Sequence, residues 1–210
     1  MRKNHEKSHA IVSAESQENS VSISIVGDVM PGGILSYNME KYEDICLSNE
    51  VRRLLKADIC LCNLECPLAQ KEAPIRNPKN KPLAVAKEEA VKILKDAGFN
   101  AVSLANNHIL DFGYSSLFKT MLLLDENNIK HTGAGKTLHE ARTPVLIDKN
   151  NLRIAFLAYA HHKSWFLHSG DTLNCRSYED WEAKKNKPGF APFNLGLVKK
   201  DVEKARQKAD

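Results

Sequence analysis

Acidic, amide and imidazole side chains follow several short apolar segments of this 210-residue chain. Asp28 follows the first apolar run, directly after Gly27. Asn63 and Glu65 follow a second run, and His108 follows a third. Carboxylate oxygens, amide oxygens and imidazole nitrogens are the ligands that Zn, Mn or Fe bind in proteins. A single loop Asn or Asp is more often a turn former, but several such groups together predict a metal-binding or acid–base site.

The evidence for a functional role differs from one side chain to the next. Gly27 lets the backbone at Asp28 approach a ligand closely, and Glu65 follows a buried strand, where an unpaired carboxylate would be costly. Asp111 has an alternative role as the cap of the helix predicted to begin near Tyr114. Of the two histidines that follow residues 152–159, at most one is expected to take part. The candidate set is Asp28, Asn63, Glu65, Asn106, Asn107, His108, Asp111 and His162.

These side chains are predicted to meet because of the elements that carry them. Apolar runs and alternation predict strands at residues 21–26, 58–62, 101–105 and 129–132. Helices are predicted at residues 87–97 and 114–126, with a short helix capped by Ser48 before the second strand. Alternating strands and helices favour a parallel sheet with right-handed crossovers. Ligands of such sheets bind outside the carboxyl ends of the strands, which is where the candidate residues lie.

The rest of the chain is predicted to form a hairpin and a final helix. Residues 144–147 and 152–159 flank Lys149-Asn150-Asn151, a turn signal. The last helix shows an apolar stripe of Val198, Val202, Ala205 and Ala209. Residues 1–20 are predicted to be a polar tail, and residues 21–210 a single domain.

Composition excludes several classes of protein. The chain is 42% hydrophobic and 27% charged, which excludes collagen-like and wholly disordered chains. Its net charge of +4 comes without a basic stripe, which argues against nucleic-acid binding. No apolar run approaches the length of a membrane span and the first residues lack the apolar part of a secretory signal, so the chain as given is expected to be cytoplasmic. The five cysteines fit no standard zinc framework and are expected to be reduced.

Three motifs together resemble the CapA family, bacterial poly-gamma-glutamate capsule-synthesis proteins of the calcineurin-like metallophosphatase superfamily. The motifs are Gly27-Asp28-Val29-Met30, the segment NLECP at 63–67 and the segment ANNHILDFG at 105–113. The resemblance runs from about residue 21 to residue 159 and includes the GAG turn at 133–135. It implies a four-layer α/β sandwich with a metal centre at the strand ends.

The resemblance also implies roles for the candidate residues. Asp28, Glu65 and Asn107 would bind divalent metal ions, one or two of Mn, Zn or Fe, and His108 would act as a proton donor or charge stabiliser. Substrate-binding or supporting roles would fall to Asn63, Asn106, Asp111 and His162. Two histidine motifs of the family, His-Trp-Gly and Gly-His-His-Pro-His, are absent from the chain. The chain is therefore expected to be truncated, with the sandwich incomplete at its C-terminal end.

Three functions are compatible with these observations. The first is a metal-dependent hydrolase or phosphatase-like domain of capsule biosynthesis, acting on a phosphoryl, acyl-phosphate or gamma-glutamyl substrate. The second is a non-catalytic component that binds the anionic capsule polymer or assembles with capsule synthetase subunits. The third is an inactive fragment. The net charge of +4 is compatible with an anionic polymer but too small to argue for one.

Overall fold

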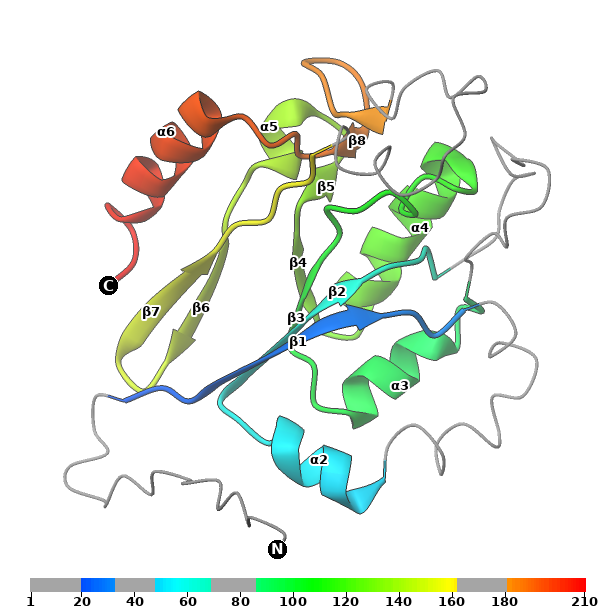
Figure 1. Cartoon of the computed structure of the whole chain (residues 1–210), viewed down its shortest axis with the longest axis vertical. Helices are drawn as coiled ribbons and strands as arrows, with labels where there is room; N and C mark the ends of the chain where they lie inside the picture. The colour runs from blue at the N-terminus through cyan, green and yellow to red at the C-terminus, as the bar shows by residue number, and fades with distance from the viewer. Residues whose placement is uncertain (1–19, 33–47, 69–85, 162–180) are drawn as a thin grey trace, which may run out of the picture.

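The computed structural model describes residues 20–32, 48–68, 86–161 and 181–210 (Figure 1). Its centre is a four-stranded sheet in the order β1-β2-β3-β4, in which all neighbouring strands are parallel. The strands are β1 (Ile23–Val29), β2 (Ile59–Leu64), β3 (Ala101–Ser103) and β4 (Lys130–Thr132). This sheet confirms the predicted α/β class, and it brings the carboxyl ends of the four strands to one edge.

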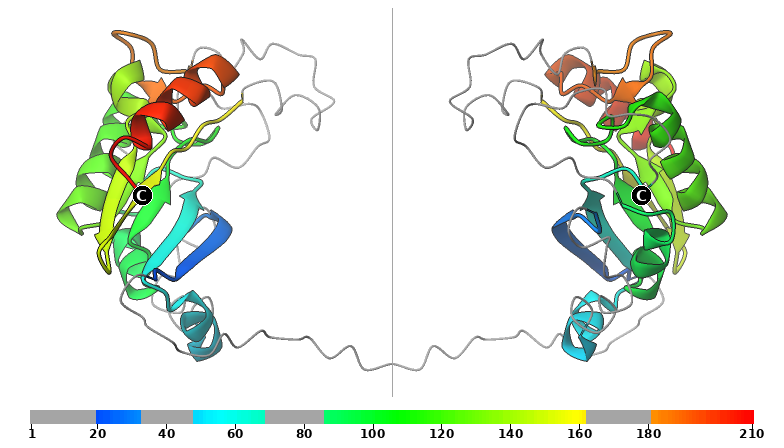
Figure 2. Two further views of the ribbon diagram at one scale, coloured as in Figure 1. Left: turned by 90° about the vertical axis from the view of Figure 1, so that its left-hand side faces the viewer. Right: turned by 90° about the vertical axis from the view of Figure 1, so that its right-hand side faces the viewer.

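Three helices connect these strands, as predicted. They are α2 (Asn49–Leu55), α3 (Ala90–Asp96) and α4 (Gly113–Glu126). The Ser48 side chain caps α2 by accepting a hydrogen bond from the backbone N–H of Val51 at 3.3 Å. Figure 1 shows α3 and α4 on the same face of the sheet, and Figure 2 shows β1 at one edge of it.

The main core lies between the sheet and the helices α3 and α4. Alternation along β2 sends Cys60, Cys62 and Leu64 to this face, where they are buried in one cluster with residues of both helices. Burial raises the pKa of the Cys62 thiol to about 12, so the thiol stays protonated at neutral pH. Cys60, Cys62 and Cys66 are buried and form no disulfide in the described part of the chain. Cys46 and Cys175 lie outside the described residues.

The predicted hairpin lies on the other side of the sheet. β6 (Val145–Lys149) and β7 (Leu152–Phe156) pair antiparallel around Asn150 and Asn151, whose φ angles are 50° and 63°. Two left-handed residues are what a two-residue turn of this twist requires. A space of about 240 Å³ separates the hairpin from the sheet and is lined by residues of both, including Leu61 and Phe156. The helix layer, the sheet and the hairpin are thus stacked in a layered α/β arrangement (Figure 1).

The C-terminal part of the described chain packs beside the hairpin. β5 (Ala134–Gly135) pairs antiparallel with β8 (Gly189–Phe190), and α5 (Leu138–Ala141) follows β5. The last helix, α6 (Leu195–Ala205), begins with Asn194, whose side chain accepts from the backbone N–H of Leu197. The predicted apolar stripe does not pack as a whole: Ala205 is buried, whereas Val202 is 41% exposed and Asp201 is buried in its place. The prediction that the helix reaches Ala209 was also wrong by one turn.

One boundary differs in a way that affects the candidate site. The sequence predicted that the first strand ends at Val26, but β1 continues to Val29 and includes Asp28. The pairing of β1 with β2 shifts between Ile25 and Asp28, after which Asp28 lies opposite Asn63. A glycine within a strand is a common site for such an irregularity. The strand resumes its pairing after the irregularity, so Asp28 is held by the sheet rather than by a loop.

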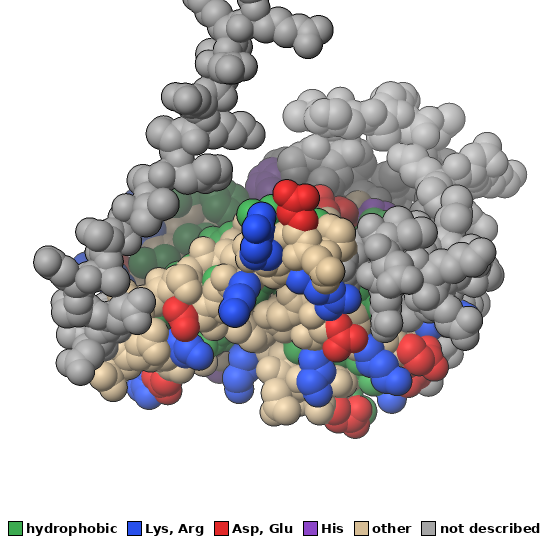
Figure 3. Space-filling model, turned by 90° about the horizontal axis from the view of Figure 1, so that it is seen from below, with side chains coloured by type: hydrophobic (Ala, Val, Ile, Leu, Met, Phe, Trp, Pro, Cys, Tyr) green, Lys and Arg blue, Asp and Glu red, His purple; other side chains and the backbone are tan. Residues whose placement is uncertain are grey.

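Basic and acidic side chains are interspersed on the face seen from below in Figure 3. No helix within the described ranges is long and apolar enough to cross a membrane.

Gly133, in the predicted GAG turn, offers a test of the packing between the sheet and the segment after β7. Its φ is +94°, and an added Cβ would lie 2.7 Å from the Cβ of Ala105 and 3.0 Å from that of Ala158. We expect Gly133→Ala to destabilise the chain by about 2 kcal/mol, through backbone strain and overlap. Urea unfolding would measure the difference. Gly27→Ala is the matched control, because its added Cβ would meet nothing within 4 Å; equal stability of the two variants would contradict the prediction.

Candidate active site at the carboxyl ends of the strands

A chain of side-chain hydrogen bonds joins the carboxyl ends of three neighbouring strands. Asn63 Nδ2 donates to Asp28 Oδ1 at 2.8 Å, linking β2 to β1. Asn106 Nδ2 donates to Asn63 Oδ1 at 3.2 Å, linking the loop after β3 to β2. The parallel register alone places these residues at one edge, and the hydrogen bonds fix their mutual orientation.

Asn106 is the centre of this arrangement. Its side chain is buried, with 3% of the residue exposed. Besides Asn63, its Nδ2 donates to the backbone carbonyl of Leu64 at 2.8 Å, and its Oδ1 accepts from the backbone N–H of His108 at 3.0 Å. A buried amide is stable only when its donors and acceptors are satisfied. Asn106 therefore sets the course of the loop that carries His108.

His108 and Asp111 form a second pair within the same loop. The Nδ1 of His108 lies 2.8 Å from Oδ2 of the buried Asp111. The N-cap of α4 is Phe112, which makes no side-chain capping bond. A carboxylate on one ring nitrogen fixes the tautomer and the orientation of an imidazole. Nε2 makes no hydrogen bond with any residue in the described ranges.

The electrostatic surroundings favour the protonated form of His108. Burial lowers the pKa of the imidazole, but the hydrogen bond and charge of Asp111, with the charges of Glu65 and Asp28, raise it by more. The pKa of His108 therefore lies above its ordinary value. An imidazolium held by Asp111 can donate a proton from Nε2, which is the property required of a general acid.

Asp28 and Glu65 are two carboxyl groups close enough to affect each other. Burial raises the pKa of Glu65, and the charge of Asp28 and a hydrogen bond with Asp28 raise it further, while the charge of His108 lowers it. Two like charges at one site oppose ionisation of both, and a bound cation relieves that repulsion. The pair therefore fits the carboxylate part of a divalent-metal site.

The described residues supply only part of a metal-binding set. Across residues 20–32, 48–68, 86–161 and 181–210, no group of three or more His, Cys, Asp or Glu side chains is placed to hold a metal ion. Asn107 lies between Asn106 and His108, is half-buried, and makes no side-chain hydrogen bond with a described residue. Its amide oxygen therefore has no side-chain partner among the described residues.

Comparison with known proteins decides the family. The family model described as bacterial capsule synthesis protein PGA_cap matches residues 22–210. The chain belongs to the PGA_cap family. It is 28% identical over 205 residues to a capsule biosynthesis protein CapA of Bacillus anthracis, which covers 96% of this chain and 46% of the relative. It is 27% identical over 195 residues to a PGA biosynthesis protein CapA of Bacillus subtilis strain 168, covering 92% of this chain and 47% of the relative.

A third relative carries a different printed name. A probable polyglutamine synthesis accessory protein of Mycobacterium tuberculosis is 32% identical over 133 residues, covering 63% of this chain and 32% of the relative. The chain thus spans less than half the length of these curated relatives. The family match includes every candidate residue from Asp28 to His162.

Within this PGA_cap chain, the structure brings most of the predicted residues together. The linked set is Asp28, Asn63, Glu65, Asn106, His108 and Asp111. His162 lies outside the described residues. Its neighbour His161 is exposed and packs edge-to-face against Phe193, with ring centroids 6.2 Å apart. The role of the Leu64 carbonyl as an anchor for Asn106 was not predicted, because a backbone group carries no signal in the residue types.

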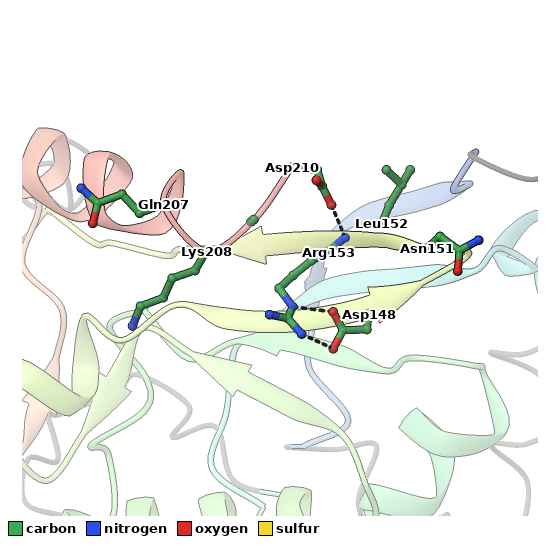
Figure 4. Close-up of a pocket in the computed structure, with 8 residues that line it drawn as sticks. Asp148, Asn151, Leu152, Arg153, Gln207, Lys208 and Asp210 are labelled. Carbon is green, nitrogen blue, oxygen red and sulfur yellow. Dashed lines mark hydrogen bonds and ion pairs between the residues drawn. The ribbon is translucent and has the colours of Figure 1, made fainter.

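A hollow elsewhere in the PGA_cap chain contains none of these residues. It has a volume of about 510 Å³ and lies between the end of the hairpin and the last residues of the chain. Figure 4 shows the ion pair between the Arg153 guanidinium and Asp148, and the Asp210 carboxylate accepting from the backbone N–H of Arg153. The candidate active site is supported by the convergence of polar groups and not by the size of a cavity.

Glu65→Gln tests the repulsion between the two carboxyl groups. The folded-state pKa of Glu65 is raised, so its contribution to stability is complete below the ordinary pKa and is lost as pH rises through the folded pKa. At pH 7 the glutamine variant lacks this repulsion, and we expect its melting temperature to rise by about 1–2 °C without added metal. Thermal unfolding at pH 4 and pH 7 would measure the difference. A gain as large at pH 4 as at pH 7 would contradict this explanation.

Proposed function

We propose that this chain is a metal-dependent, phosphatase-like hydrolase domain of capsule-polymer biosynthesis. The observation that carries the proposal is the His108–Asp111 pair beside the carboxyl groups of Asp28 and Glu65. The names of the relatives, which refer to capsule and PGA biosynthesis, support the biological setting. The substrate class we propose is a phosphoryl, acyl-phosphate or gamma-glutamyl compound.

Asp28, Glu65 and Asn107 would hold one or two divalent metal ions of the Mn, Zn or Fe kind. When bound, such an ion supplies Lewis-acid polarisation of a phosphoryl or acyl oxygen. The residues of the chain do the rest: Asn63 and Asn106 hold Asp28 and the loop in register. His108 donates a proton from Nε2 to the leaving group, and Asp111 keeps the ring in the orientation that this transfer needs.

A second function is favoured by two observations. The described residues provide no group of three acidic, histidine or cysteine ligands, and one relative is named an accessory protein of polymer synthesis. The alternative is therefore a component that binds an anionic polymer or a synthetase subunit without turnover. Its partners would be the capsule polymer and capsule synthetase subunits.

Hydrolysis of a phosphodiester in the presence of added metal would separate the two. The chain is incubated with Mn²⁺ or Zn²⁺ and bis-p-nitrophenyl phosphate, beside His108→Ala and a metal-free sample. Metal-dependent release of p-nitrophenol that is lost in His108→Ala supports the hydrolase. Equal rates in the wild type and His108→Ala, or polymer binding with no metal uptake and no turnover, would favour the second function.

A further inference from the structure

A hollow of about 180 Å³ lies between α5 and α6, apart from the candidate active site. Its lining residues include His139, Arg142, Asp201, Lys204 and Lys208. None of the residues at the carboxyl ends of β1, β2 and β3 contributes to it. The hollow therefore requires its own explanation.

Positive charge dominates this hollow because its one carboxylate is already neutralised. Asp201 accepts two hydrogen bonds from Arg142, from Nε at 2.8 Å and from Nη2 at 2.7 Å. It also accepts from the Tyr159 hydroxyl at 2.9 Å. No further carboxylate of the described residues lines the hollow to neutralise Lys204 and Lys208, and the His139 imidazole also lines it.

Several donors at this hollow have no described partner. Lys204 and Lys208 form no ion pair with any carboxylate in the described ranges. Nη1 of Arg142 likewise has no acceptor among these residues, while the bidentate pair with Asp201 holds the guanidinium in place. A guanidinium fixed in this way is a preorganised donor for a second carboxylate or phosphate.

The two lysines are spaced to meet successive charges. Lys204 lies in the last turn of α6 and Lys208 in the turn that follows the helix, and both line the hollow. Both are exposed, and a single small anion at an exposed site gains little from such charges. A chain with repeated negative groups gains more, because binding of one group raises the local concentration of the next.

We propose that the hollow between α5 and α6 binds carboxylate groups of an anionic polymer. The assignment of that polymer as polyglutamate rests on the proposed function, whereas the anion site itself does not. In this arrangement Arg142 Nη1 binds one carboxylate inside the hollow, and Lys204 and Lys208 bind carboxylates further along the polymer. The candidate active site then acts on, or beside, a polymer that the chain holds at a separate position.

Anisotropy of a fluorescein-labelled gamma-linked polyglutamate oligomer would test the proposal at low salt. We expect the double variant Lys204→Gln/Lys208→Gln to bind the oligomer at least tenfold more weakly than the wild type. The control is Lys199→Gln/Lys200→Gln, which removes the same charge from exposed positions of α6 that do not line the hollow. We expect that control to weaken binding less than twofold.

The outcomes are distinguishable from failure of the hydrolase proposal. Equal weakening in both double variants, or no binding by the wild type, would overturn the site. Tighter binding of polyphosphate with the same dependence on Lys204 and Lys208 would overturn the assignment to carboxylates. His108→Ala should bind the oligomer as the wild type does, whether or not the chain hydrolyses any substrate, and a tenfold loss in that variant would also contradict a separate site.

Discussion

Asp28→Ala should lower the affinity for divalent metal, whereas His108→Ala should leave the metal bound and lower turnover by roughly 10²–10⁴-fold. Asp28 is a carboxylate beside Glu65, so its loss removes half of the negative charge that would hold a cation. His108 is turned toward Asp111 through Nδ1, and in our proposal its Nε2 acts on the substrate. Elemental analysis of the dialysed proteins and hydrolysis of a phosphodiester would measure the two effects.

The roles would be reversed if His108→Ala lost the metal and Asp28→Ala retained it. Asp28→Asn is a useful companion, because an asparagine can still hydrogen-bond to Asn63 while it lacks the charge. If the charge is what matters, Asp28→Asn should bind metal as poorly as Asp28→Ala. Unfolding measurements on the three variants would show whether any loss follows from a general loss of structure.

If His108 is the general acid, turnover should depend on pH, and Asp111 should set where that dependence lies. Burial lowers the pKa of His108, and Asp111 contributes most to raising it above the ordinary value, through its hydrogen bond and its charge. A general acid works while protonated, so turnover should fall as pH rises through the pKa of His108. Asp111→Asn removes the raising charge, so the fall should begin at lower pH. The folded state should also lose stability over the same rise in pH, because a raised histidine pKa stabilises most below the ordinary value of about 6.5.

The sequence predicted the sheet well because its signals are local. The runs at 58–62 and 101–105 alternate or are wholly apolar, and each is followed by a helical pattern with a recognisable end. The extension of β1 to Val29 was missed because it depends on pairing with β2 beyond the irregularity at Gly27. Nothing in the residues of β1 alone shows that Asp28 regains its partner at Asn63.

The candidate site was predicted at the level of residue types but not of connections. Convergence of Asp28, Asn63 and His108 followed from their places after parallel strands. The position of Asn106 as the buried link between Asn63, Leu64 and His108 did not follow, because two adjacent asparagines in a loop look alike in sequence. Spacing alone did not predict the pairing of Asp111 with His108, since a carboxylate three residues after a histidine is equally well placed to cap the next helix.

The ion pair that attaches α6 to the end of α5 was the feature that the sequence predicted least well. We expect its loss to have a large effect on stability. Arg142 and Asp201 are 59 residues apart in the chain and form a bidentate ion pair whose side chains are 16% and 9% exposed. The apolar stripe predicted for this helix does not make this attachment, because Val202, one of its members, is 41% exposed. A buried ion pair between distant segments leaves no periodic signal, so apolar patterning found the helix but not the contact that fixes it.

Asp201→Ala should therefore destabilise the chain by about 3–5 kcal/mol, because it leaves the largely buried Arg142 guanidinium without its partner. Burial and the neighbouring Asp201 carboxylate raise the pKa of Tyr159 well above its ordinary value, so its hydroxyl is a permanent donor to Asp201. Tyr159→Phe removes that single hydrogen bond and should cost only about 1 kcal/mol. Urea unfolding of both variants would give the two values.

The double variant Arg142→Met/Asp201→Leu removes both charges. It therefore separates the stability lost by leaving Arg142 unpaired from the stability that the ion pair itself contributes. Apolar side chains of similar volume often replace a buried ion pair with little loss, so we expect this variant to recover most of the stability that Asp201→Ala loses. If Asp201→Ala cost no more than Tyr159→Phe, α6 would be held mainly by Ala205 and its other apolar contacts. If the double variant were as unstable as Asp201→Ala, the ion pair itself, and not relief of an unpaired charge, would be what holds α6 against α5.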